Sequence, residues 1–235
     1  MAVAPTDFRR RSPVYRELEA LGAEFAEVNG SAAAISCGRE VAAETEQART
    51  LGLCDLSALR RGGFKGWRTS EWLREEGVEV DDESNRAYPQ TDGSLIARLS
   101  PGEVLILGDL SGASAILEKL MAAWNMAAGE GTYPVPRADT NCCFGVTGRF
   151  AGAMFAKLCG VDLRPEKFAN RLVAQTSIAR LNGIVIRADL GETLSYTLLT
   201  DSASASYMWG CLIDAADEFA GAPVGLDALR KLAER

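Results

Sequence analysis

The stretch CFGVTGRFAGAMFAKLCGV at residues 143–161 decides the fold, together with AQTSIARLNGIVIRADLGETLSYTLL at residues 174–199. The first part predicts a strand up to Thr147, a turn at Gly148 and then a helix, because its apolar residues recur every three or four positions. The second part predicts two strands, because β-branched residues recur with a period of two, and the strands meet in a turn at 189–192. Together they indicate one α+β unit.

A similar unit comes earlier in the chain, which indicates an internal duplication. Residues 64–80 also predict strand, glycine, helix, glycine and strand, with Gly66 in the place of Gly148. The segment that starts at residue 104 matches the segment that starts 92 positions later without a gap. In each copy we expect a strand, a helix, two strands and a helix, with the helices on one side of a small sheet.

Composition excludes several classes of function. The chain has 235 residues, 47% of them hydrophobic, and a net charge of -7, which argues against a nucleic-acid partner. Its basic run at residues 8–11 is either a mobile arm in solvent or an anchor on an acidic partner subunit. No signal-peptide pattern is present, and no apolar run reaches the roughly 18 residues that span a bilayer. We therefore expect a cytoplasmic protein without membrane contact.

The sequence predicts no catalytic residue and no metal site. It contains no histidine, which excludes Ser-His-Asp and Cys-His catalysis and most catalytic zinc sites. Its six cysteines form no CxxC pair and are expected to be mostly small buried residues. Asp55 and Ser57 lack a base that would activate the serine, so we interpret them as the end of a strand.

Two polar side chains are the candidate ligand-binding residues. Glu192 lies in the tight turn at 189–192, which is either a solvated loop or a place where a carboxylate accepts hydrogen bonds from a pterin-like ligand. Tyr88 lies in the acidic, turn-rich segment 81–93, which we predict to be an exposed loop. Alone, Tyr88 would be an exposed aromatic residue.

Four motifs carry a resemblance to a known family. SPVYRELEALGAEFAEVNG at 12–30 resembles the opening SPLYxxHxxLGAxFxxFxGW of the T-protein family, the aminomethyltransferases of glycine cleavage. LGLCDLSALRRGGFKG at 51–66 resembles its VGLFDLSHMGRVxVxG. The segments 143–163 and 191–215 resemble its VxGPxAxxxLxxL and GExGYEIxLPxxxAxxLWxxLLEA. Within this superfamily, the chain is most similar to the gamma subunit family of heterotetrameric sarcosine oxidase.

The resemblance implies a fold and a division of the chain. The fold class is α+β, a duplicated folate-binding T-protein-like fold of two interlocked α+β subdomains that lacks the C-terminal barrel. Residues 1–54 would be an N-terminal helix and strands that pack on the second subdomain. Residues 55–130 would form the first α+β subdomain, and residues 131–235 the second.

The departures from the family pattern weaken the implied folate site. The family carries GGVIDDLIVYRL, whose aspartate lies beside the reacting atom of tetrahydrofolate, whereas this chain has the shorter TDGSLIARL at 91–99. Tyr88 would match the tyrosine before that element, and Glu192 would match the glutamate of the family's YTGE. The histidine of the DLSHM motif is missing. The resemblance therefore implies that this chain binds no cofactor firmly and leaves weak tetrahydrofolate binding open.

The resemblance also implies a role within a complex. We expect a gamma-type subunit of a heterotetrameric sarcosine oxidase, or of a related N-methyl amino acid oxidase or dehydrogenase, that passes a one-carbon unit to tetrahydrofolate. The chain itself would be mainly structural and non-catalytic. Its partners would be alpha, beta and delta subunits, which would carry FAD, FMN and NAD. The alternative is a free-standing tetrahydrofolate-dependent aminomethyl or methyl transferase.

Overall fold

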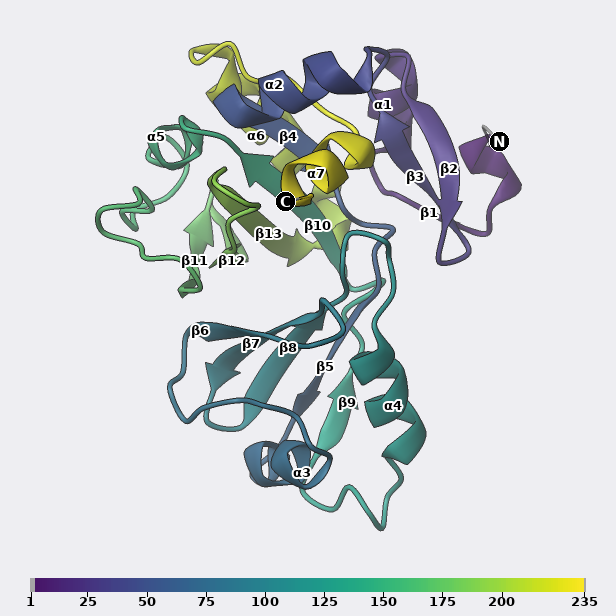
Figure 1. Ribbon diagram of the computed structural model, residues 1–235, viewed down its shortest axis with the longest axis vertical. Helices are drawn as coiled ribbons and strands as arrows, with labels where there is room; N and C mark the ends of the chain where they lie inside the picture. The colour runs from purple at the N-terminus through teal and green to yellow at the C-terminus, as the bar shows by residue number, and fades with distance from the viewer. Residues whose placement is uncertain (1–2, 235) are drawn as a thin grey trace.

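Two β-sheets stacked end to end organise the molecule, and Figure 1 shows them as an upper and a lower subdomain. The computed structural model describes residues 3–234. The lower subdomain contains β5 (Arg61–Lys65), α3 (Thr69–Glu75), β6 (Arg86–Pro89), β7 (Leu95–Ser100), β8 (Glu103–Leu107), α4 (Ala115–Ala123) and β9 (Tyr133–Val135). The upper subdomain contains β10 (Asn141–Thr147), α5 (Ala151–Phe155), β11 (Val173–Ile178), β12 (Leu181–Arg187), β13 (Ser195–Asp201), η2 (Ser202–Ser204), α6 (Ala205–Asp217) and β14 (Ala222–Pro223).

The two subdomains repeat one order of elements, so the predicted duplication is confirmed. The lower sheet has the strand order β6-β7-β8-β5-β9, and the upper sheet has β11-β12-β13-β10-β4-β14. Leu117 of α4 and Trp209 of α6, which are matched in the sequence, are both buried. Gly66 and Gly148, which begin the two strand-to-helix turns, both have a positive φ. A side chain at either glycine would collide with a backbone carbonyl oxygen, so both turns require glycine.

Several predicted elements need correction. Three strands, not two, lie between the helices of each subdomain, because residues 173–187 fold back at Ala179 and Arg180, which both have a positive φ. The segment 81–93 is not wholly an exposed loop, because β6 lies within it and buries Ala87. The strand that we expected to end at Asp55 and Ser57 is β4 (Gly52–Asp55), so Ser57 lies beyond it.

The N-terminal part of the chain adds to the upper subdomain. It comprises η1 (Pro5–Asp7), β1 (Arg10–Arg11), α1 (Tyr15–Ala20), β2 (Glu24–Val28), β3 (Ser31–Ser36) and α2 (Val41–Leu51). The basic run is not a mobile arm, since β1 pairs in parallel with β3 and the Ser31 hydroxyl donates to the Arg10 carbonyl oxygen. The division at residues 54 and 130 stays a prediction, and residues 1, 2 and 235 of its outer segments lie outside the described range.

Three apolar cores hold these layers together. The upper sheet packs against α1, α5 and α6 in one core that includes Phe144 and Trp209. The lower sheet packs against α3 and α4 around Phe64 and Trp72. The third core lies between the two sheets and includes Leu105, from the lower sheet, and α7 (Leu226–Ala233). This shared core makes the two sheets one structural unit.

A buried carboxylate fixes α7 against the N-terminal part. Glu44 of α2 accepts hydrogen bonds from the backbone N–H groups of Cys37 at 2.6 Å, Arg39 at 3.3 Å and Gly225 at 2.7 Å. Gly225 precedes α7, and a Cβ atom there would lie 2.1 Å from the Ile35 carbonyl oxygen. The start of α7 is therefore held by charge-assisted hydrogen bonds and by close backbone packing.

Arg61 joins the two places where the chain crosses between the subdomains. The chain descends from β4 to β5 through residues 56–60 and returns from β9 to β10 through residues 136–140. Arg61 is 4% exposed, and its guanidinium donates five hydrogen bonds to carbonyl oxygens of both crossings and of β10. The acceptors are Ser57 and Leu59 on the first crossing, Arg137 and Ala138 on the second, and Asn141 at the start of β10.

None of the helices within residues 3–234 is long and apolar enough to cross a membrane.

Replacing Arg61 with lysine should lower the free energy of unfolding by about 3 kcal/mol or more, because an ammonium group has three donors and cannot reach both crossings. The matched control is Arg60→Lys, whose exposed ion pair with Glu118 should tolerate the change within about 0.5 kcal/mol. Urea denaturation followed by circular dichroism measures both. Equal stability of the two variants would contradict the role of Arg61.

Candidate functional site

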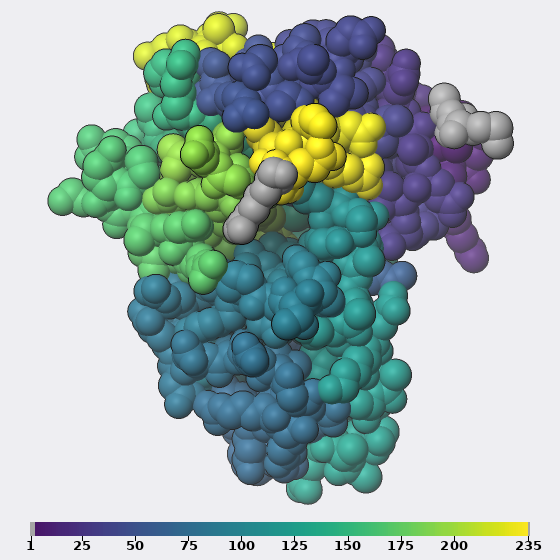
Figure 2. Space-filling view, in the orientation of Figure 1, coloured from purple at the N-terminus to yellow at the C-terminus, as the bar shows by residue number. Residues whose placement is uncertain are grey.

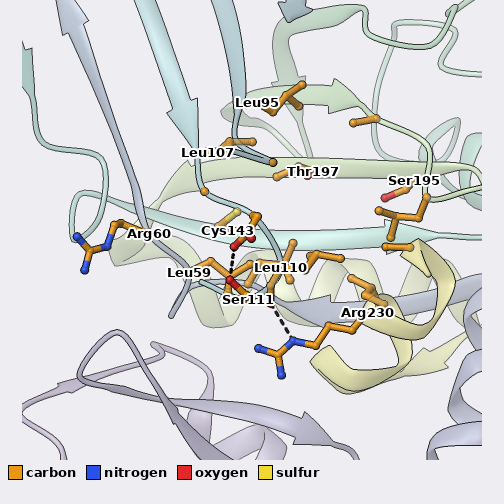
Figure 3. A pocket seen from close by; sticks show the side chains of 18 of the residues that line it. Leu59, Arg60, Leu95, Leu107, Leu110, Ser111, Cys143, Ser195, Thr197 and Arg230 are labelled. Atoms are coloured by element: carbon orange, nitrogen blue, oxygen red, sulfur yellow. Dashed lines mark hydrogen bonds between the residues drawn. The ribbon is translucent and has the colours of Figure 1, made fainter. Parts of the chain in front are cut away.

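A cavity of about 490 Å³ lies where the two subdomains meet (Figure 3). Segments from both halves of the chain surround it: the first crossing, the ends of β7 and β8, the loop before α4, β10, the β12–β13 turn and α7. Its aliphatic lining consists of Leu56, Leu59, Leu95, Leu107, Leu110, Ala188, Leu190, Leu229 and Ala233. Its polar lining consists of Arg60, Arg61, Asp109, Ser111, Cys143, Ser195, Thr197, Arg230 and Glu234. The site is thus apolar inside with a few polar groups, as ligand pockets usually are.

Most of the charged groups around the cavity already have protein partners. Arg60 forms an ion pair with Glu118 at 2.6 Å. Arg230 pairs with Asp227 at 2.9 Å, and its Nε donates to the Leu110 carbonyl oxygen at 2.9 Å, a hydrogen bond visible in Figure 3. The Asp109 carboxylate accepts from the Ser111 hydroxyl at 2.6 Å and from the backbone N–H of Ala113 at 2.9 Å. These groups stabilise the walls of the cavity.

Cys143 is the cysteine that lines the cavity, where the other potential nucleophiles are hydroxyl groups. Its environment makes the thiol unreactive. Burial raises the pKa of the Cys143 thiol to about 11, and the nearby positive charge of Arg61 offsets this only in part. The reactive form of cysteine is the thiolate, so at neutral pH this side chain remains a protonated thiol. The described residues also contain no group of three or more side chains that could hold a metal ion.

The Asp55-Leu56-Ser57 motif lies at the end of β4, and both of its polar side chains form hydrogen bonds within the protein. The Asp55 carboxylate accepts the backbone N–H of Ser57, and the Ser57 hydroxyl accepts the backbone N–H of Cys143 at 3.1 Å. Burial raises the pKa of Asp55, while hydrogen bonds from Ser12 and Ser57 act in the opposite direction. The motif therefore fastens the first crossing to β10 and presents no free acid to the cavity.

The structure does not bring Tyr88 and Glu192 together around the cavity. Tyr88 lies in β6, packs in part against the core of the lower subdomain, and donates its hydroxyl to the Glu83 carbonyl oxygen at 2.9 Å. Glu192 is exposed in the β12–β13 turn, whereas its neighbours Leu190 and Ser195 line the cavity. Their assignment as folate contacts stays a prediction.

The β12–β13 turn is held by an ion pair that the sequence did not indicate. Arg187 contacts both carboxylate oxygens of Asp189, at 3.0 and 2.7 Å, and donates to the Phe168 carbonyl oxygen at 2.6 Å. The side chains of Arg187 and Asp189 are 9% and 16% exposed. Asp189 is thus occupied within the protein, and it fixes the turn that places Leu190 in the cavity wall.

The short segment 91–99 contributes an apolar wall to the cavity, not a carboxylate. Gly93 and Leu95 line it, while Asp92 accepts the backbone N–H of Ile116 at 2.9 Å in the first turn of α4. Partial burial acts to raise the pKa of Asp92, but hydrogen bonds from Ile116 and Ser94 more than offset this and lower it. The N-cap of α4 is Ser114, whose hydroxyl accepts a hydrogen bond from the backbone N–H of Leu117.

Sequence analysis missed most of the residues that form the cavity. Leu190, Ser195 and Arg230 come from elements that meet only after both halves have folded. One signal in the sequence could have indicated the cavity. In β13, Ser195 and Thr197 are polar residues two positions apart, so they lie on the same face of the strand. Nothing in the sequence indicated that Arg230 faces the loop before α4.

Comparison with solved structures identifies the fold. No family model and no curated protein matches the sequence. A chain of the heterotetrameric sarcosine oxidase from Corynebacterium sp. U-96, in complex with pyrrole 2-carboxylate, is similar with a TM-score of 0.65 and 21% identity, over 91% of this chain and 97% of that one. The glycine cleavage system aminomethyltransferase T from Bartonella henselae is similar with a TM-score of 0.74 and 17% identity, over 95% of this chain and 62% of that one. The predicted T-protein-like α+β fold is confirmed.

The extent of the two matches differs. The chain spans less than two thirds of the aminomethyltransferase, but nearly the whole of the sarcosine oxidase chain. At these identities the likeness concerns the fold, and the chemistry has to be inferred from this chain's own side chains.

Cys143 should resist alkylation at pH 8, because its pKa of about 11 leaves only a trace of thiolate at that pH. Cys211, which is half-buried on α6, should be labelled first and is the internal control. Iodoacetamide labelling of the native protein followed by mass spectrometry measures both sites. Faster labelling of Cys143 than of Cys211 would show an activated thiol in the cavity.

Proposed function

We propose that this chain is a non-catalytic, gamma-type subunit of a heterotetrameric sarcosine oxidase, or of a related N-methyl amino acid oxidase or dehydrogenase. The cavity carries this proposal, because its charged groups are engaged in holding the walls. The match over 97% of a chain of a heterotetrameric sarcosine oxidase supports it. In this proposal, FAD, FMN and NAD are bound by alpha, beta and delta partner subunits.

The proposed role is to brace the complex and to form one wall of its interior. The shared core between the sheets and the five hydrogen bonds of Arg61 make the two subdomains a stiff support. General acid–base chemistry at the cavity would need a group that titrates near neutral pH and reaches the ligand. The Asp55 carboxylate accepts a hydrogen bond from the backbone N–H of Ser57, and the Cys143 thiol stays protonated.

Exposed apolar side chains at the lower end of the molecule also support a subunit. Trp67, Met126 and Tyr133 are 80%, 70% and 50% exposed, and a Cβ atom at Gly131 would lie 2.5 Å from the Trp67 ring. Tyr133 pairs with Lys65, two residues before Trp67, so these two aromatic residues form an exposed patch of the kind that a partner covers. Trp67 follows β5 and Tyr133 begins β9 in the lower subdomain, whereas β1 of the basic run lies in the N-terminal part of the chain (Figure 1).

A free-standing tetrahydrofolate-dependent aminomethyl or methyl transferase is the second candidate. The observation that favours it is the cavity itself, whose 490 Å³ and mixed lining suit a small organic ligand. The same fold occurs in aminomethyltransferase T, although that protein is considerably longer. The two candidates differ in whether this chain alone binds tetrahydrofolate and turns over.

Titration of the isolated chain with tetrahydrofolate distinguishes them. The subunit proposal predicts a dissociation constant of about 1 mM or weaker by calorimetry, unchanged in Glu192→Gln. Micromolar binding that Glu192→Gln abolishes would favour the transferase. In parallel, the tagged chain purified from its native host should bring down flavin-containing chains that oxidise an N-methyl amino acid. Oxidase or methyl-transfer turnover by the chain alone would refute the subunit proposal.

Trp67→Ser should weaken assembly with these partners at least about tenfold without unfolding the chain, because an exposed aromatic anchor contributes to binding and little to the isolated fold. Tyr207→Ser is the matched control, since Tyr207 is 53% exposed on α6 of the upper subdomain. Recovery of partner chains and the melting temperature are measured for both. Full recovery with Trp67→Ser would exclude the patch as an interface.

A further inference from the structure

A second cavity, of about 420 Å³, lies on the upper subdomain where the N-terminal strand meets the second crossing. Its lining is Arg9, Arg10, Arg11, Pro13, Ser57, Arg61, Ala138, Asp139, Asn141, Ser202 and Ala203. We call it the arginine cleft. Four of these residues are arginines and one is an aspartate, in a chain whose net charge is -7. The cleft is therefore a local concentration of positive charge on an acidic protein.

The arginines differ in how far their charge is compensated. Arg10 donates from Nε to the Asp139 carboxylate at 2.7 Å and from Nη2 to the Ala138 carbonyl oxygen at 3.0 Å. Arg9 and Arg11 are exposed, and among residues 3–234 no carboxylate lies within 4 Å of either guanidinium. Arg11 lies over the Tyr15 ring, 5.5 Å from its centroid. Within residues 3–234, these two guanidinium groups thus face solvent without a carboxylate partner.

The buried charge of Arg61 adds to this field. Its five hydrogen bonds all go to neutral carbonyl oxygens, so no carboxylate contacts it directly. A charge held below the surface in a medium of low dielectric constant projects a stronger potential than a hydrated one. The floor of the arginine cleft therefore attracts anionic groups, and Arg9 and Arg11 are placed to bind them.

The details of the cleft favour a protein segment over a small anion. Small anions are usually held by converging backbone N–H groups, but here Ser202 N donates to the Thr140 carbonyl oxygen and Ala203 N to the Asp201 carboxylate. The remaining donors are exposed guanidiniums, which suit carboxylates presented from another surface. The order of this segment, with β1 paired to β3, means that a partner would meet a preformed surface.

We propose that the arginine cleft docks an acidic segment, rich in aspartate or glutamate, of a partner subunit. This rests on the proposed function, because it assumes that the chain works within a complex. Arg9 and Arg11 form the ion pairs with the segment, and Arg10 and Arg61 hold the cleft in shape.

The direct test uses a fluorescent polyglutamate peptide and the full chain. Binding measured by anisotropy should weaken at least about tenfold in the double variant Arg9→Glu/Arg11→Glu, and also when salt is raised from about 0.05 to about 0.3 M. The double variant Arg149→Glu/Arg180→Glu makes the same charge change at exposed arginines elsewhere and should bind as the unchanged chain does. Equal binding by all three proteins would overturn the proposal.

Two further measurements complete the test. If about 10 mM inorganic phosphate raises the melting temperature through Arg9 and Arg11 while the peptide does not bind, the cleft is a small-anion site and the proposal is wrong. In purification from the native host, the Arg9→Glu/Arg11→Glu variant should lose the flavin-containing chains that the control variant retains. If neither variant brings down such chains, the proposed function fails, whereas the peptide result still decides the cleft.

Discussion

The structure depends on one buried guanidinium. Arg61 donates all of its N–H groups to carbonyl oxygens of the two crossings and of β10, so it fixes the lower subdomain beneath the upper one. Carbonyl oxygens left unpaired at this depth would be costly, which makes the position intolerant of a shorter or less branched donor. The same side chain lines the central cavity on one side and the arginine cleft on the other. One interaction thus shapes the interior and the proposed docking surface.

The central cavity combines an apolar lining with charged groups that mostly have partners within the protein. The leucines from both subdomains keep it open, while Asp109, Arg60 and Arg230 are paired within the protein. A catalytic group must be free to exchange a proton or contact a ligand. In this chain, the charged side chains at the cavity form hydrogen bonds and ion pairs with the turns and helix ends that build its walls. This is the physical basis for proposing a structural subunit. The space-filling view shows the upper subdomain resting directly on the lower one, with α7 at their junction (Figure 2).

Local patterns predicted the elements better than the site. The apolar period after Gly148 predicted a helix, and α5 there buries Met154 and Phe155, since the packing of one helix on one sheet depends on neighbouring residues. Ser111 and Ser114 are equally good caps in isolation, and the start of α4 also depends on Asp92 of another loop, whose carboxylate accepts a hydrogen bond from the backbone N–H of Ile116. Tyr88 and Glu192 were predicted as ligand-binding residues from their residue type and from the turns near them. Neither property indicates the direction in which a side chain points.

The sequence by itself determined the α+β class, the duplication and the absence of histidine chemistry, because repeats and composition are properties of the chain in order. Only the tertiary structure decided that β4 inserts between β10 and β14, that the basic run forms a strand, and that the acids near the cavity are occupied. These outcomes depend on contacts between residues far apart in sequence. Arg61 is the clearest case: its five acceptors lie up to 80 positions away, so its role exists only once both crossings are in place.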